Sequence, residues 1–178
     1  MTSPAESLRP PAKSPAAGDK ALSLVGPSGS GKTELICRLL AWFEAQGLKV
    51  AVLKHTHKLD LGDTGKDTWR FAQAGARLVA LAAPGLMQVT RYSPEEPPLA
   101  TVLAALAPEV DLILVEGYKK SPLPKVAVVG PELEDVLTDY SQVIALISAA
   151  PLTSHLPVFN PQQIAELGAF IKKYLGYE

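Results

Sequence analysis

The stretch "GPSGSGKT", residues 26–33, decides the fold that this sequence predicts. The apolar run before it, "ALSLV" at 21–25, is typical of a short buried strand. The residues after it place large apolar side chains at helical spacing: Leu35, Ile36, Leu39, Leu40 and Phe43. Residues 26–33 fit G-x-x-x-x-G-K-[ST] at every specified position. They also lie where that motif requires them, between an expected strand and an expected helix.

This loop has the features of a binding site for a nucleotide polyphosphate. Glycines allow successive backbone N–H groups to turn toward one side and surround an anion. The helix that starts near Lys32 directs its positive end at the same place. Lys32 would reach the β and γ phosphates, and the Thr33 hydroxyl would bind Mg²⁺. No other common ligand class needs all of these features at once.

Beyond the loop, strand-like and helix-like segments alternate along the chain. Apolar runs typical of buried strands lie at 48–54, 111–117, 125–130 and 142–148. Helical spacing indicates helices within 64–76, 99–107 and 161–175, and residues 77–83 and 86–92 flank Pro84-Gly85 as a hairpin. This order predicts an α/β fold of the P-loop NTPase type, with three layers, a mostly parallel sheet and helices on both faces.

Composition narrows the class of protein. The chain has 178 residues with a net charge of −1, so no basic field points to nucleic acid. Residues 1–20 are rich in Pro, Ala and Ser without an apolar core, which predicts a disordered tail before one domain at 21–178. No apolar run approaches the length of a membrane span. The single cysteine, Cys37, excludes an internal disulfide, which fits a reducing compartment, and we expect a cytoplasmic protein. Cys37 itself is expected to be a small residue of the core.

A second acid for the metal site is expected at the end of a neighbouring strand. In "DLILVEG" at 111–117, Glu116 follows four apolar residues at the expected carboxyl end, where open α/β sheets bind their ligands. Asp111 lies at the other end of this strand and is interpreted as a turn residue.

The polar segment after the second expected strand allows several interpretations. It contains His55, His57, Asp60, Asp63, Lys66 and Asp67. The two histidines could bind a metal only on an extended backbone, so polar loop residues are the favoured interpretation. Lys54 and Lys66 could meet phosphates. Asp63 or Thr64 could cap a helix, and Asp67 could be an acid of its first turn.

Three runs taken together resemble the molybdopterin-guanine dinucleotide biosynthesis protein B family (MobB). They are "GPSGSGKTEL", "VLKHTHK…D…GKDTWRFAQAGA" and "DLILVEGYK", and the match runs in order from about Ala21 to the C-terminus. The first run is common to many NTPases, and the other two are far more specific. The resemblance implies a homodimeric P-loop protein that binds GTP and Mg²⁺, hydrolyses GTP slowly, and assists the guanylyltransferase that attaches GMP to molybdopterin.

The resemblance also assigns roles to matching positions. Thr33 and Glu116 would serve Mg²⁺, and His55, His57, Lys66 and Asp67 fall in the family's second signature, near the nucleotide or the pterin phosphate. Lys32 would stabilise charge during hydrolysis, while Asp63 and Asp67 are either water-positioning or purely structural residues. The expected phosphate-binding residues are Gly26, Pro27, Ser28, Gly29, Ser30, Gly31, Lys32, Thr33 and Glu34.

The chain departs from the family pattern at several points. Glu34 and Lys58 stand where relatives often have a threonine and a histidine. Ser148-Ala149 offers no carboxylate where a base-reading acid would lie, and there is no N-K-x-D motif, so a guanine preference rests on the resemblance alone.

Three other functions are compatible with a P-loop fold. One is a small-molecule kinase that uses Asp60 or Asp63 as base. Another is a metal-insertion GTPase that carries metal on His55 and His57. The third is an adaptor that binds nucleotide without hydrolysing it.

Overall fold

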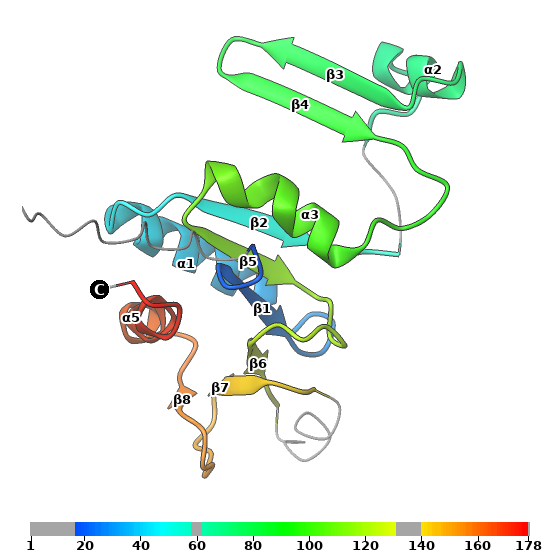
Figure 1. The fold of residues 1–178 in the computed structure, drawn as a ribbon. Helices are drawn as coiled ribbons and strands as arrows, with labels where there is room; N and C mark the ends of the chain where they lie inside the picture. Colours follow the sequence, from blue (N-terminus) through cyan, green and yellow to red (C-terminus); the bar gives the residue numbers. More distant parts are fainter. Residues whose placement is uncertain (1–16, 58–61, 131–139, 178) are drawn as a thin grey trace, which may run out of the picture.

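A computed structural model of the chain describes residues 17–57, 62–130 and 140–177, and its centre is a parallel β-sheet (Figure 1). The sheet has six strands, every neighbouring pair is parallel, and the order is β2-β5-β1-β6-β7-β8. In that order the strands are β2 (Val50–Lys54), β5 (Leu112–Glu116), β1 (Ala21–Val25), β6 (Lys125–Val128), β7 (Val143–Ile147) and β8 (Val158–Phe159). Buried strands with near-continuous apolar sequence form its centre, as predicted for a parallel sheet covered on both faces.

Helices cover both faces of the sheet, which confirms the three-layer α/β prediction. On one face, α1 (Lys32–Ala45) and α5 (Ile164–Tyr174) pack over Leu22 and Leu114. The two helices approach so closely that a Cβ at Gly168 of α5 would lie 2.4 Å from the ring of Trp42 on α1. On the other face, α3 (Leu99–Leu106) covers Ile113 and neighbouring apolar residues, and a short 3₁₀ helix, η1 (Ala107–Glu109), follows it.

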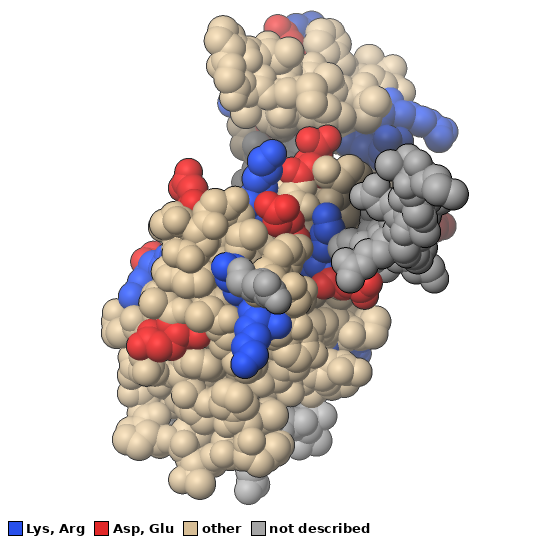
Figure 2. Space-filling view, turned by 60° about the vertical axis from the view of Figure 1, so that its left-hand side comes forward, with Lys and Arg blue, Asp and Glu red and all other residues tan. Residues whose placement is uncertain are grey.

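A second, two-stranded sheet stands away from the main body (Figure 1). It consists of β3 (Leu78–Ala83) and β4 (Leu86–Arg91), an antiparallel hairpin that turns at Pro84-Gly85 as predicted. The preceding helix, α2 (Asp67–Gln73), contacts β3 and buries none of its own residues. We call residues 62–92 the arm. Figure 2 shows the arm as a mostly uncharged projection, with charged side chains of both signs where it meets the body.

Some sequence-based expectations differ from the structure or lie outside its described part. Cys37 is exposed, so its assignment to the core was wrong. It lies off the apolar stripe of α1, which runs through Leu35, Ile36, Leu39 and Phe43. Most of the predicted tail at 1–20 lies outside the described residues, and the division into a tail and one domain at 21–178 stays a prediction. No helix in the described ranges is both long and apolar enough to cross a membrane.

Candidate functional site

The loop between β1 and α1 adopts a backbone suited to binding an anion. Gly26, Gly29 and Gly31 all have positive φ angles, of 148°, 73° and 83°. Left-handed residues among ordinary ones are the geometry that turns neighbouring N–H groups toward a common centre. At the start of α1, the N-cap residue Gly31 offers no side chain to the first-turn amides. The first N–H groups of a helix have no partner within it, so they are available to an anion bound at this loop.

Gly26 is needed where it stands for a further reason, which is space. A Cβ at this position would lie 2.6 Å from the carbonyl oxygen of Val128 on β6. Its φ of 148° is also a conformation that side chains rarely adopt. The loop therefore begins at a position that only glycine fills without strain.

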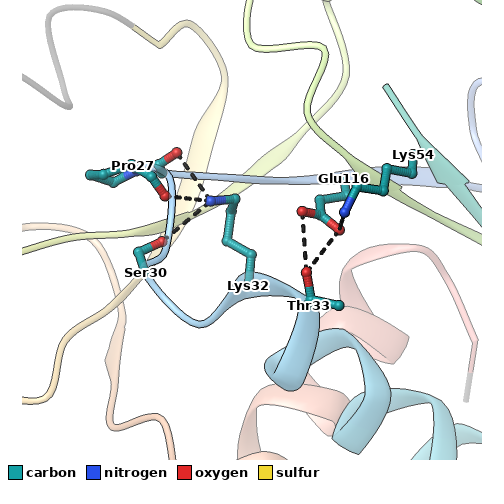
Figure 3. Close-up of polar contacts among 7 residues, drawn as sticks. Pro27, Ser30, Lys32, Thr33, Lys54 and Glu116 are labelled. Carbon is teal, nitrogen blue, oxygen red and sulfur yellow. Dashed lines mark hydrogen bonds and ion pairs between the residues drawn. The ribbon is translucent and has the colours of Figure 1, made fainter. Parts of the chain in front are cut away.

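Lys32 reaches across the loop (Figure 3). Its Nζ donates to the carbonyl oxygens of Pro27 at 2.5 Å and Gly26 at 3.3 Å, and to the Ser30 hydroxyl at 3.3 Å. Burial lowers the pKa of Lys32; the Glu116 carboxylate opposes this effect, and Lys119 and Lys54 add to it. The ammonium is thus held in front of the loop in surroundings that an additional anion would improve.

Glu116 lies beside the loop at the carboxyl end of β5, as predicted (Figure 3). The Thr33 hydroxyl lies 3.2 and 3.3 Å from its two carboxylate oxygens. Lys54, at the end of β2, places its Nζ 3.4 Å from Oε2 of the same carboxylate. The parallel register explains the grouping, because Glu116 is paired with Leu24 of β1 on one side and with Lys54 on the other.

The side chains at this point fit a hard divalent cation. A threonine hydroxyl and a carboxylate converge on one place, and Mg²⁺ prefers such oxygen ligands, with phosphate oxygens and water completing its shell. Thr33 and Glu116 are therefore the residues that would hold Mg²⁺ next to a bound polyphosphate.

A second group of side chains lies next to Glu116 on the β2 side. The rings of His55 and Tyr118 pack with centroids 4.4 Å apart, and His57 contacts His55 edge to face at 4.8 Å. Glu96 joins them from the segment after the arm, with Oε1 2.9 Å from Nε2 of His55, although the two are not aligned as a hydrogen bond. Burial raises the pKa of Tyr118, and the charge of Glu96 together with its hydrogen bond to the phenol adds to this effect.

The backbone between these groups is tightly constrained at Gly117. This residue has a φ of 102°, and a Cβ there would lie 3.2 Å from the Cβ of His55. Its carbonyl accepts a 2.5 Å hydrogen bond from the Ser23 hydroxyl of β1. The histidines and Tyr118 are thereby fixed next to the phosphate loop.

The remaining predicted site residues lie on the arm. Lys66 is the N-cap of α2, and its N–H donates to the carbonyl of Asp63 at 2.9 Å. The Asp63 carboxylate accepts from the Thr68 hydroxyl at 3.3 Å, and Asp67 lies 3.6 Å from Arg70 in the first turn of the helix. No described contact joins these three residues to the phosphate loop. Asp60 and Lys58 lie outside the described residues.

The structure brings two residues to the site that sequence reasoning did not select. Glu96 lies in a proline-rich stretch without periodicity, and its contact with His55 spans the whole arm. Tyr118 belongs to a recognisable run, but its φ of 49° and its stacking on His55 cannot be read from local spacing. Within the described ranges, no three His, Cys, Asp or Glu side chains are grouped so as to hold a metal ion.

Comparisons with known proteins all indicate the same family. The family model for molybdopterin guanine dinucleotide synthesis protein B matches residues 21–149. A molybdopterin-guanine dinucleotide biosynthesis adapter protein of Haemophilus influenzae is 31% identical over 88% of this chain and 89% of its own length. A probable one of Bacillus subtilis is 34% identical over 78% of this chain and 84% of its own.

Solved structures agree with this grouping. The crystal structure of Bacillus subtilis MobB has a TM-score of 0.71 and 31% identity, and the match covers 89% of this chain and 99% of that one. A MobB homolog from Bacillus stearothermophilus has a TM-score of 0.68 and 29% identity, with 88% and 97% covered. The phosphate loop and the acid at the end of β5 both lie within residues 21–149, which the family model matches. The chain therefore belongs to the MobB family of molybdopterin guanine dinucleotide synthesis proteins.

Proposed function

We propose that this protein is a GTP-binding adaptor in molybdenum cofactor biosynthesis that assists a guanylyltransferase in joining GMP to molybdopterin. Family membership supports the pathway, since the relatives are named biosynthesis adapter proteins. The observation that carries the nucleotide role is the arrangement of Lys32, Thr33 and Glu116 around the glycine-rich loop. We place its action in the cytoplasm.

The chemistry available to the chain is electrostatic. Lys32 and the first-turn amides of α1 would bind the phosphates and offset the charge that spreads over a γ-phosphate during hydrolysis. Mg²⁺ held by Thr33 and Glu116 would neutralise further phosphate charge when bound. The two acids considered for positioning water, Asp63 and Asp67, have partners on the arm. A badly placed base accounts for the slow hydrolysis that we expect.

The protein is further proposed to act as a homodimer, and the arm supports this. Strand pairing places Leu78, Ala80, Ala82, Met87, Val89 and Arg91 on one face of the hairpin. Leu78 and Val89 are each 52% exposed, and Met87 is 76% exposed. A two-stranded sheet is at best marginally stable without cover on an apolar face. Within the described part of the chain, α2 contacts β3, where Val79 on the opposite face is buried.

A second copy of the same chain is the occupant we assign to this face. Five of these six positions carry no charge, and the sixth, Arg91, is exposed at the end of β4. Two such faces can therefore pack their apolar positions together while the arginines stay at the edge of the contact. The face is continuous along both strands of the hairpin, which gives an elongated contact suited to a twofold arrangement.

Calorimetric titration with GTP, GDP and ATP, each with and without Mg²⁺, tests the nucleotide role. We expect micromolar or tighter binding of GTP that requires Mg²⁺, and weaker binding of ATP. Phosphate release measured with the partner enzyme present separates a slow GTPase from an adaptor that does not hydrolyse. Equal binding of ATP and GTP would contradict the guanine assignment, and failure of all three to bind would contradict the nucleotide role.

A further inference from the structure

A pocket of about 790 Å³ opens directly beside the candidate magnesium site, at the ends of β2 and β5. Its lining includes His55, Tyr118, Lys119, Lys120 and Ser121. Lys119 is close enough to Lys32 to influence its pKa, so the pocket and the phosphate loop share one electrostatic environment. A volume of this size suits a small organic ligand. The phosphate loop lies outside the pocket, whose residues are thus not needed to hold the nucleotide phosphates.

The chemistry of the lining suits an anion attached to a flat ring. His55 and Tyr118 provide aromatic surface, and Leu99 and Pro122 add apolar surface. Lys119 and Lys120 are exposed, and within the described residues neither belongs to an ion pair. The Nζ of Lys119 lies over the ring of Tyr140, 5.6 Å from its centroid, which leaves Lys120 as the lysine available to a ligand. A cation next to aromatic rings suits a phosphorylated heteroaromatic compound.

Ser121 provides an independent sign of a missing partner. Its side chain is 8% exposed, and its hydroxyl has no hydrogen-bond partner among the residues that the structure describes. A buried hydroxyl without a partner is unfavourable, and such groups in native proteins are uncommon. A phosphate oxygen in the pocket would supply the partner.

The turn that carries these groups is fixed before any ligand arrives. The N–H of Ser121 donates to the carbonyl of Tyr118 at 2.9 Å, which closes the turn around the two lysines. Behind it, the fully buried Lys125 donates to the carbonyls of Ser121 at 2.6 Å and Leu123 at 3.0 Å. A preorganised turn lowers the entropy cost of binding.

Glu96 lies at the rings of His55 and Tyr118, the part of the pocket that a ligand ring would occupy. Of the described residues that line the pocket, Glu96 alone is acidic, and it contacts both His55 and Tyr118. It is exposed, so it can leave without disrupting the core.

We propose that this pocket binds a phosphate monoester of a flat heteroaromatic ring, with the phosphate at Lys120 and Ser121 and the ring against His55 and Tyr118, and that Glu96 gives way to it. The inference rests on the proposed function, in which the ligand is of the pterin class. It places this ligand beside the candidate magnesium site at Thr33 and Glu116.

The test titrates 6-hydroxymethylpterin phosphate with the full chain and measures binding from the fluorescence anisotropy of the pterin. Lys120→Ala is expected to weaken binding about tenfold, because a charge-assisted contact is lost. Lys173→Ala, an exposed lysine on α5, serves as the matched control and should leave the affinity unchanged. Glu96→Gln should tighten binding, and unphosphorylated 6-hydroxymethylpterin should bind more weakly than the phosphate.

Ser121→Ala separates a binding role from a structural one. It removes a buried hydroxyl without a partner, so the melting temperature should hold or rise while affinity for the probe falls. Equal probe affinities for the wild type, Lys120→Ala and Ser121→Ala would overturn the inference, as would a failure of the wild type to bind the probe. Titration of the wild type with GTP and Mg²⁺ separates the pocket assignment from the proposed function. If GTP binds and the probe does not, the pocket assignment alone is wrong. If neither binds, the proposed function is contradicted as well.

Discussion

The hydroxyl of Thr33 lies within 3.3 Å of both carboxylate oxygens of Glu116, across 83 positions of sequence. The contact exists because β1 and β5 are parallel neighbours in the sheet. Thr33, in the helix that follows β1, therefore meets Glu116 at the end of β5. A hydroxyl and a carboxylate held together at the carboxyl edge of a parallel sheet would supply two ligands of the proposed magnesium site, with phosphate oxygens and water supplying the others.

Replacement of Lys32 by alanine should weaken GTP binding by about 10- to 100-fold, because a charge-assisted hydrogen bond contributes about 1.5–3 kcal/mol. Calorimetric titration measures the change, and the far-UV circular dichroism spectrum should stay the same. Lys173→Ala on α5 is the control. An unchanged affinity in Lys32→Ala would remove this lysine from the phosphate site.

Glu116→Gln should weaken the dependence on Mg²⁺ and leave the fold intact. The amide keeps the size of the side chain and can still accept from Thr33, but it lacks the charge that Mg²⁺ and Lys54 both engage. The measurement is GTP affinity as a function of Mg²⁺ concentration, and the midpoint should move to higher concentration. The same midpoint in variant and wild type would show that Glu116 does not serve the metal.

Gly26→Ala should lower the free energy of unfolding by about 1–3 kcal/mol, because it strains a left-handed backbone position. The new methyl group would also press on the Val128 carbonyl, which a Cβ would approach to 2.6 Å. Chemical denaturation measures this loss, and GTP affinity should fall with it. Gly130→Ala is the matched control, because no atom lies within 4 Å of a Cβ built there. If both variants are equally stable, the proposed constraint at Gly26 is wrong.

Much of the fold could be predicted because its signals are local. Apolar runs of strand length and helical spacing each depend on neighbouring residues, and they located the strands on either side of the loop and the helix after it. The two-residue strand β8 carries too little pattern to be recognised. The turn at Pro84-Gly85 predicted the hairpin, but nothing in its sequence indicates that the hairpin forms its own sheet away from the main one.

Some residues of the candidate site could likewise be predicted from local sequence, and others could not. Lys32, Thr33 and Glu116 follow from a motif and a strand end, which the parallel topology then brings together. Asp63, Lys66 and Asp67 are close in sequence to His57, but they belong to the arm, at or just before the start of α2, and their described contacts are with other residues of the arm. The approach of Glu96 to His55 depends on how the chain returns from the arm, which is a tertiary contact that no local pattern encodes.

Stability should depend on pH through Lys125. This lysine is fully buried in β6, and burial lowers its pKa below the ordinary 10.5. The unfolded chain then binds the proton more tightly than the folded chain, so the free energy of unfolding should rise as pH increases through the lowered pKa toward 10.5. Lys125→Met should reduce this rise in denaturation curves recorded from neutral pH upward and leave the part due to Lys32, whose pKa burial also lowers. Lys173→Met should keep the whole rise. A rise as large in Lys125→Met as in the wild type would assign the effect to other groups.

Met87→Lys combined with Val89→Lys should convert a dimer to a monomer, because two charges would be buried in the proposed contact between arms. Sedimentation velocity measures the change in mass. Gln88→Lys, on the opposite face of the same strand, is the control and should remain dimeric. A double variant with the mass of the wild type would exclude this face as the dimer interface.

The most direct test of the nucleotide site is a crystal structure of the protein with a non-hydrolysable GTP analogue and Mg²⁺. The account predicts phosphate oxygens within the loop at 26–33, with Nζ of Lys32 moved from the Pro27 carbonyl onto a phosphate and the metal next to Thr33 and Glu116. A loop without phosphate, with Lys32 still on the Pro27 carbonyl and the analogue bound elsewhere, would contradict it.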